Sequence, residues 1–252
     1  MGRLEGKVAI VTGANSGVGA ATAKLFAAEG ASLVITARRL EPLQAVADEI
    51  TAAGGKVVAM KADISVIADD DASVKLALDT YGKLAILVNC AGVLDTDIRP
   101  IDCYLDSDWE KVFSVNAKGT MQMTRAALTA LKTGASVVNV VSVSALNGGG
   151  GAAYTASKGA IVTMTKHAAL RYQNAQIRFN AICPGTIVTP MVAGMDPAKI
   201  NQDMIGAMAQ HSNLQAPPCM PEDVANVALF LASDESKCIT GQIITTDFGS
   251  NL

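Results

Sequence analysis

Aromatic and charged side chains are both scarce in this chain of 252 residues. Only 4% of the residues are Phe, Trp or Tyr, only 17% are charged, and the net charge is −3. Without a dense cluster of Lys and Arg, the chain lacks the electrostatic footprint that nucleic acid or an anionic membrane requires of a main partner. These absences predict a protein that acts on small molecules.

Targeting and metal-binding signals are absent as well. The opening residues 1–7 carry charges where a secretory signal has an apolar run, and no segment reaches the length of a membrane span. The five cysteines include no C-x-x-C pair, and His167 and His211 have no second ligand at metal spacing. We therefore expect a cytoplasmic protein with free thiols, no metal and no membrane partner.

What the sequence does contain is a regular alternation of strand-length apolar segments with helical stretches. Seven such segments occur, at Val8–Val11, Ser32–Ile35, Val57–Met60, Ile86–Val88, Val137–Val141, Ile177–Ile182 and Gln242–Thr245. Their hydrophobicity is continuous, which indicates strands covered on both faces. We predict a single α/β domain over residues 1–252, with a doubly wound, seven-stranded parallel sheet and helices on both faces.

Tyr154 and Lys158 stand four residues apart in a helical stretch, so the phenol and the ammonium share one helix face. A nearby positive charge favours phenolate, which predicts a pKa for Tyr154 below its usual value of about 10. Such a pair makes a general acid or base. An ordinary surface pair is the alternative.

A glycine-rich turn, residues 12–19, separates the first apolar segment from an amphipathic one. Gly13 suits a tight turn, Gly17 a close backbone approach to a pyrophosphate, and Gly19 the packing of a helix on the sheet. The helix that follows would point its N-terminus at the phosphates. The turn therefore predicts a dinucleotide site, with a simple turn as the alternative.

The end of the second segment bears on the choice of cofactor. A carboxylate there would bind the ribose 2′-OH of NAD and repel a 2′-phosphate, but the chain has Ala37, followed by Arg38 and Arg39. Guanidinium groups bind phosphate through charge-assisted hydrogen bonds. We predict NADP(H) as the cofactor, the alternative being two arginines that only solvate a helix start.

Two further regions surround the expected pocket. Residues 186–221 hold five prolines, five of the ten methionines and no clear strand, which predicts an irregular lid; its methionines form either an apolar substrate wall or part of the core. Asp95, Asp97 and Asp102 follow the fourth segment, and we expect solvated loop carboxylates there.

Taken together, these motifs make the chain resemble the short-chain dehydrogenase/reductase family nearly end to end. The matching motifs are the T-G-x-x-x-G-x-G turn, Asp63, Asn89-Cys90-Ala91-Gly92, Asn116, Ser142, Tyr154 with Lys158, and Pro184 to Thr189. The resemblance implies a single-domain Rossmann fold. The chain departs from the family pattern at Cys90 and Ala85 and in the spacing from Ser142 to Tyr154. This spacing leaves Ser144 as an alternative catalytic serine.

The resemblance also implies roles for individual residues. Tyr154 would be the general acid and base, Ser142 a donor to the carbonyl oxygen, Lys158 a ligand of the ribose hydroxyls, and Asn116 the anchor of a proton-relaying water. Asp63 would bind the adenine amino group and Thr189 the carboxamide. The complete cofactor set is Gly13, Asn15, Ser16, Gly17, Val18, Gly19, Arg38, Arg39, Asp63, Ile64, Asn89, Ala91, Gly92, Tyr154, Lys158, Pro184, Gly185, Ile187 and Thr189.

The expected function is NADP(H)-dependent interconversion of a secondary alcohol and a ketone. The low-charge, Met-rich lid suits a bulky apolar ketone such as a hydroxysteroid or bile acid. One alternative is a 3-oxoacyl thioester reductase of fatty-acid synthesis, and another is a non-catalytic NADP(H)-binding sensor or scaffold. The resemblance further implies a homotetramer, with a dimer second, assembled through two long helices at residues 107–132 and 153–171.

Overall fold

The computed structural model describes residues 2–95 and 97–251 and contains a seven-stranded parallel sheet of order β3-β2-β1-β4-β5-β6-β7. The strands are β1 (Val8–Thr12), β2 (Ser32–Ala37), β3 (Lys56–Lys61), β4 (Leu84–Asn89), β5 (Leu131–Val140), β6 (Arg178–Pro184) and β7 (Ile243–Thr246). The predicted doubly wound α/β fold is confirmed.

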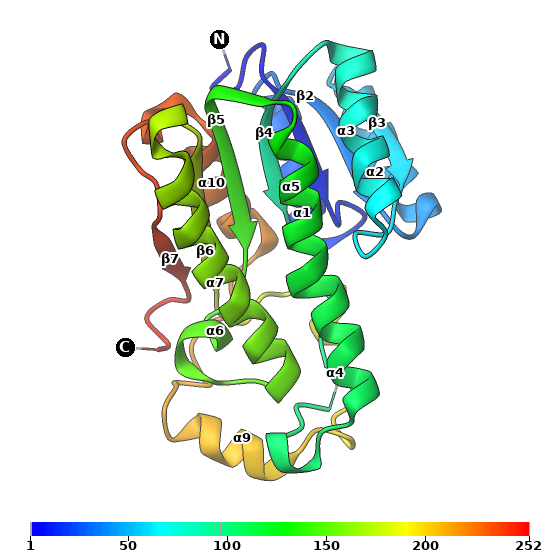
Figure 1. Cartoon of the computed structure of the whole chain (residues 1–252). Helices are drawn as coiled ribbons and strands as arrows, with labels where there is room; N and C mark the ends of the chain where they lie inside the picture. The colour runs from blue at the N-terminus through cyan, green and yellow to red at the C-terminus, as the bar shows by residue number, and fades with distance from the viewer. Residues whose placement is uncertain (1, 96, 252) are drawn as a thin grey trace.

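Both faces of the sheet are covered by helices (Figure 1). One core cluster joins the sheet to α1 (Gly17–Ala28), α2 (Leu40–Ala52) and α10 (Pro221–Ala232). A second cluster joins the other face to α3 (Ile67–Tyr81), α5 (Thr120–Leu128) and α7 (Ala152–Tyr172). Along β1, Ala9 and Val11 face the first cluster, whereas Val8 and Ile10 face the second, as the alternation of side chains along a strand requires.

The predicted helix at residues 107–132 is wrong in two respects. It is interrupted, because α4 (Asp106–Phe113) is followed by a π-helical segment, η2 (Ser114–Gly119), before α5 begins. It also ends early, since β5 begins at Leu131 and not at the predicted residue 137. The pairing of β5 with β4 shifts register between Leu84 and Ile86, and Gly134 has a φ of 88°, so this strand bulges at its start.

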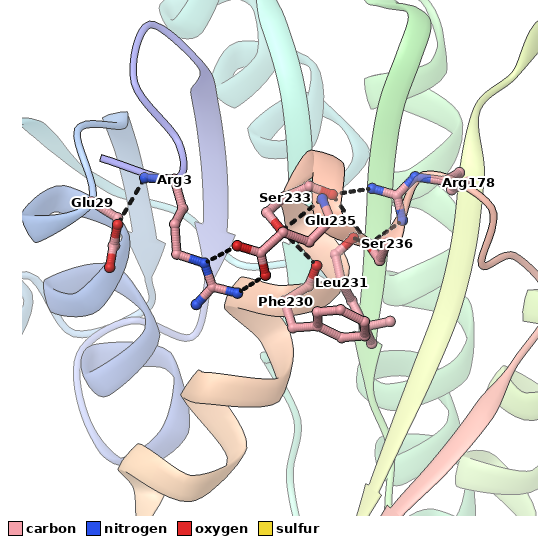
Figure 2. A network of polar contacts seen from close by, with 8 residues as sticks. All are labelled: Arg3, Glu29, Arg178, Phe230, Leu231, Ser233, Glu235 and Ser236. Carbon is pink, nitrogen blue, oxygen red and sulfur yellow. Dashed lines mark hydrogen bonds and ion pairs between the residues drawn. The ribbon is translucent and has the colours of Figure 1, made fainter. Parts of the chain in front are cut away.

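A buried guanidinium ties β6 to the end of α10 at the amino edge of the sheet (Figure 2). Arg178 is 7% exposed and donates to Ser236 Oγ at 2.9 Å and to the Ser233 carbonyl oxygen at 3.1 Å. Ser233 is the C-cap of α10, so its carbonyl belongs to the negative end of the helix dipole. Nearby, Arg3 forms an ion pair with Glu235, so the N-terminal segment is fastened to the same place.

The remaining elements lie beyond the carboxyl ends of the strands or on loops. They are α6 (Ser144–Asn147), α8 (Pro190–Ala193), α9 (Gln202–Ala209), and the 3-10 turns η1 (Ile101–Cys103), η3 (Gln173–Ala175) and η4 (Asp234–Ser236). In Figure 1 the arrowheads of the strands point toward α6 and α9. Ile187 and Cys219 form a parallel bridge, which joins the two ends of the predicted lid. Within the described residues, no helix is both long enough and apolar enough to cross a membrane.

Candidate active site at the carboxyl edge of the sheet

A cavity of about 840 Å³ lies where the carboxyl ends of the strands meet, as parallel sheets of this kind provide. Its wall contains residues from β1, β2, β5 and β6 and from the loops that follow these strands and β4. Nearly all of the predicted site residues line it. The exceptions are Asn116, Asp63 and Asn89, whose side chains lie in the surrounding structure.

The glycine turn has the shape of a phosphate cradle. A Cβ on Gly13 would lie 2.8 Å from the Ala91 Cα, and one on Gly19 would overlap the Gly13 carbonyl oxygen. Gly17 has a φ of 53°, and a Cβ there would lie 3.1 Å from Thr189 Cγ2. Ser16, the N-cap of α1, accepts no hydrogen bond through its side chain, so the first N–H groups of α1 can bind an anion. These residues fit the pyrophosphate of a dinucleotide cofactor.

The cavity extends to the end of β2, where no carboxylate occurs. The strand ends at Ala37, and the exposed side chains of Arg38 and Arg39 line the cavity. Among residues 2–95 and 97–251, neither arginine forms an ion pair. Two guanidinium groups are therefore available to a phosphate at this end of the cavity.

Asp63 and Asn89 lie behind the residues that line the cavity and hold the surrounding structure in place. Asp63 accepts hydrogen bonds from the N–H and the hydroxyl of Ser65, which together with the charge of Arg38 lower its pKa against the effect of burial. Asn89 donates to Asn139 Oδ1 at 2.8 Å, and so joins β4 to β5. Binding of adenine by Asp63 stays a prediction.

Tyr154 and Lys158 lie together on the first turns of α7. The Lys158 ammonium is 5.7 Å from the centre of the Tyr154 ring and donates to the Val140 carbonyl oxygen at 3.0 Å. Lys158 is only 5% exposed. A Cβ on Gly92 would lie 3.5 Å from its Nζ, so a glycine at this position leaves the ammonium open to the cavity.

The predicted pKa of Tyr154 is wrong in direction. Burial raises the pKa of Tyr154 to about 12, and a hydrogen bond from Ser142 only partly opposes this effect. Burial also lowers the pKa of Lys158 to about 8. Desolvation disfavours the charged form of each group, and for Tyr154 it is the largest cause of the shift.

Ser142 is the serine that contacts the Tyr154 phenol. Its Oγ lies 3.0 Å from Ser144 Oγ, within hydrogen-bond distance, and accepts from the Ser144 N–H at 3.1 Å. Ser144 is the first residue of α6, and its contacts with Ser142 Oγ orient the Ser142 hydroxyl. The geometry therefore favours Ser142 for the catalytic role and Ser144 for its orientation.

Asn116 lies on the π-helical segment η2, an irregularity that is frequent at functional sites. Its side chain accepts from the Val93 N–H at 2.8 Å, and donates to the Val93 carbonyl oxygen at 2.9 Å and to Ser157 Oγ at 3.1 Å. The side chain thus fixes the loop after β4 against α7. The water relay through Asn116 stays a prediction.

The expectation that Asp95 is solvated is wrong. It is 9% exposed, it lines the cavity, and its Oδ2 accepts from the Tyr104 hydroxyl at 3.1 Å. Burial raises the pKa of Asp95 to about 6. The sequence marked Asp95 only as a loop carboxylate and did not single out Tyr104. The one available signal was the position of Asp95 a few residues after a strand that ends at the cavity.

The lid contributes less apolar wall than its composition predicts. Of its five methionines, Met191 lines the cavity, whereas Met195, Met204, Met208 and Met220 do not. The departure at Cys90 has little structural effect, because the Thr12 hydroxyl accepts from the N–H groups of Cys90 and Ala91, each at 3.1 Å.

Comparisons with known proteins agree with this geometry. A family model described as enoyl-(acyl carrier protein) reductase matches residues 13–251. The chain is 36% identical to 3beta-hydroxysteroid dehydrogenase 2 of Eggerthella lenta, over 98% of this chain and 95% of that protein. It is 34% identical to cyclohexanol dehydrogenase of an Acinetobacter species, over 97% of this chain and 95% of that protein.

A solved structure shows the same architecture. The short-chain dehydrogenase/reductase SDR:glucose/ribitol dehydrogenase of Brucella melitensis superposes with a TM-score of 0.87 at 31% identity, over 100% of both chains. The match extends over the glycine turn, α7 and the last strand. The chain therefore belongs to the short-chain dehydrogenase/reductase family of nicotinamide-dependent oxidoreductases.

Proposed function

We propose that the protein is an NADP(H)-dependent oxidoreductase that interconverts a secondary alcohol and a ketone. The observation that carries the proposal is the meeting of Tyr154, Lys158 and Ser142 in the same cavity as the glycine turn. An acid, a cation and a hydroxyl donor around one reacting oxygen are what carbonyl reduction requires.

The nicotinamide cofactor, when bound, donates or accepts the hydride. Tyr154 transfers the proton: with a pKa of about 12 it is a phenol at neutral pH, ready to protonate the carbonyl oxygen in reduction. Ser142 donates a hydrogen bond to the same oxygen as charge develops on it. The Lys158 ammonium holds the ribose hydroxyls and stabilises phenolate when Tyr154 acts as the base in oxidation.

NADP(H) is favoured over NAD(H) by the end of β2. Arg38 and Arg39 offer cations to a 2′-phosphate, and Ala37 offers nothing that would repel it. A substrate with a bulky apolar body is supported by the apolar cavity residues Leu94, Val141, Ile187 and Met191. Two relatives named for cyclic alcohols, a hydroxysteroid and cyclohexanol, support the same class, which includes bile acids.

A 3-oxoacyl thioester reductase is the second candidate, because the matching family model is described as an acyl carrier protein reductase. An acidic carrier needs a basic surface, and Arg171 is the one base in the last turn of α7. A non-catalytic NADP(H) sensor ranks third, since the Tyr, Lys and Ser are all retained. We further propose a homotetramer in the cytoplasm, with a dimer as the alternative.

The test combines a panel of carbonyl substrates, followed by NADPH absorbance, with the Tyr154→Phe variant. This variant removes the proton and keeps the ring, so kcat on the best substrate should fall by roughly a hundred- to ten-thousand-fold, while NADPH binding measured by fluorescence survives. The control is Tyr172→Phe, because Tyr172 packs against Phe179 outside the cavity. Ordinary turnover by Tyr154→Phe would disprove the assigned chemistry.

A further inference from the structure

Asp95 occupies an unusual environment for a carboxylate. It is nine-tenths buried, and among the described residues no cation forms an ion pair with it. Its Oδ2 has the Tyr104 hydroxyl as a partner, whereas its Oδ1 is enclosed without one. Burial of a carboxylate without a cation is unfavourable, so the position calls for an explanation beyond packing.

The carboxylate packs directly on the start of the catalytic helix. Gly151 is the N-cap of α7, and any Cβ there would overlap both oxygens of Asp95. The backbone N–H of Tyr154, in the first turn of α7, faces the same carboxylate. A helix N-terminus attracts a negative charge, so Asp95 both seats α7 and brings its charge next to Tyr154.

Two further carboxylates near Asp95 lie beside a cation, although the charge of Asp97 still contributes to the raised pKa of Asp95. Asp97 pairs with Arg99 at 2.7 Å, and Asp108 lies 3.9 Å from the same guanidinium. On α7, the one cation near Tyr154 is Lys158, one turn farther along the helix. Tyr154 is thus placed between the anion of Asp95 and the ammonium of Lys158.

We propose that Asp95 is a positioning residue of the reaction: held by the Tyr104 hydroxyl, its carboxylate seats the first turn of α7 and opposes Lys158 in setting the ionisation of Tyr154. The negative charge favours the phenol form. The inference rests on the proposed role of Tyr154. It explains the glycine at position 151, which the close approach of the carboxylate requires, and the phenol at position 104, which lowers the pKa of Asp95.

Asp95→Asn is the direct test, because it removes the charge at constant size and keeps an oxygen for Tyr104. The ionisation of Tyr154 is read as the difference in tyrosinate absorbance between each protein and its Tyr154→Phe counterpart. Measurements stay within the pH range where circular dichroism shows an intact fold. We expect the ionisation to move to lower pH by roughly one to three units, as for a charge about 4–12 Å away at an effective dielectric constant of about 20. The pH profile of alcohol oxidation should move in the same direction.

Asp108→Asn is the matched control, since this residue lines the same cavity but lies beside Arg99. This variant should leave both the tyrosinate titration and the pH profile of alcohol oxidation unchanged. A purely structural role for Asp95 would alter the melting temperature and the rate without moving the ionisation. Coincident titrations of Asp95→Asn and the unmodified protein would overturn the proposal.

Tyr104→Phe keeps the proposal testable if Asp95→Asn does not fold. Without this donor the pKa of Asp95 rises further, so the charge disappears at mildly acidic pH and persists at alkaline pH. The oxidation profile of Tyr104→Phe should therefore depart from that of the unmodified protein near pH 6–7, around the pKa of about 6 for Asp95, and rejoin it above. A uniform change across the pH range would contradict the proposal. Failure of the proposed function is distinct, since it would appear as full turnover by Tyr154→Phe.

Discussion

The two edges of the same sheet bury polar groups in opposite ways. At the amino edge, Arg178 reaches the carbonyl of Ser233 and the hydroxyl of Ser236, and no side-chain atom of these three residues is buried without a partner. At the carboxyl edge, one oxygen of Asp95 is enclosed without a hydrogen-bond partner. Among the described residues, the Lys158 ammonium donates one hydrogen bond only, to the Val140 carbonyl oxygen.

The difference shows how polar burial serves stability at one edge and chemistry at the other. Groups whose partners come from the chain itself stabilise the fold. A group that burial drives toward its neutral form near working pH costs stability, and displaced pKa values gather at sites of proton transfer. Substitutions at the two edges should therefore have opposite effects on folding and on turnover.

Lys158→Met should give the largest effect and the sharpest contrast. Turnover should fall by roughly a hundredfold or more, because the acid-base pair is broken. The folded protein should nevertheless become more stable at pH 7, by on the order of 1–2 kcal/mol. The pKa of Lys158 falls from 10.5 to about 8 on folding, so the charged ammonium costs stability at about 1.4 kcal/mol per pKa unit. This cost exceeds the stability that is lost with its one hydrogen bond.

The pH dependence of unfolding checks the cause of that effect. Between the folded pKa of about 8 and the unfolded value of 10.5, the unfolded chain binds more protons at Lys158, so its contribution to stability rises with pH in this window. Denaturant unfolding of Lys158→Met should lack this rise. Lys166→Met, at an exposed position of the same helix, should keep it. A less stable Lys158→Met at pH 7 would show that this ammonium supports the fold.

Arg178→Met should have the opposite signature. The Ser233 and Ile239 carbonyls would lose a buried donor, and the free energy of unfolding should fall by about 1–3 kcal/mol, measured by denaturant titration. The kcat of the folded enzyme should stay unchanged, since this residue is at the edge of the sheet opposite the cavity. Arg171→Met, at an exposed position, is the control. A loss of kcat in Arg178→Met would contradict the separation of the two edges.

The fold could be predicted because the inner strands are buried on both faces and read as continuous apolar runs. The outer strands β3 and β7 are only partly buried, but they carry short apolar segments as well. Helix boundaries were harder, since the π-helical turn at Asn116 and the early start of β5 at Leu131 depend on packing against neighbouring elements. Only the structure shows that Gly119 must be small: a Cβ there would lie 2.8 Å from the Ile64 carbonyl oxygen.

The site divides in the same way. Gly13, Tyr154 and Lys158 could be placed at the cavity from the sequence, because each residue type has a chemical reason to stand at its spacing. Asp95 and Tyr104 could not, because their significance comes from a tertiary approach to Gly151. The displaced pKa values were equally hidden, since desolvation depends on everything that surrounds a group and a pair of residues in a sequence carries no information about it.

The smallest expected effect compares two arginines. Arg178 is buried with neutral acceptors all around it, whereas Arg38 is exposed at the cavity without an ion pair among the described residues. If Arg38 binds a 2′-phosphate, Arg38→Ala should lower the ratio of kcat/KM for NADPH over NADH by roughly tenfold, the worth of one charge-assisted hydrogen bond. The melting temperature should change little, because Arg38 forms no ion pair among the described residues and its charge acts only weakly on Asp63. Arg171→Ala should leave the ratio intact. Equal or better activity of the unmodified protein with NADH would exclude the phosphate role, and Arg38 would then be a solvated cation beside the start of α2.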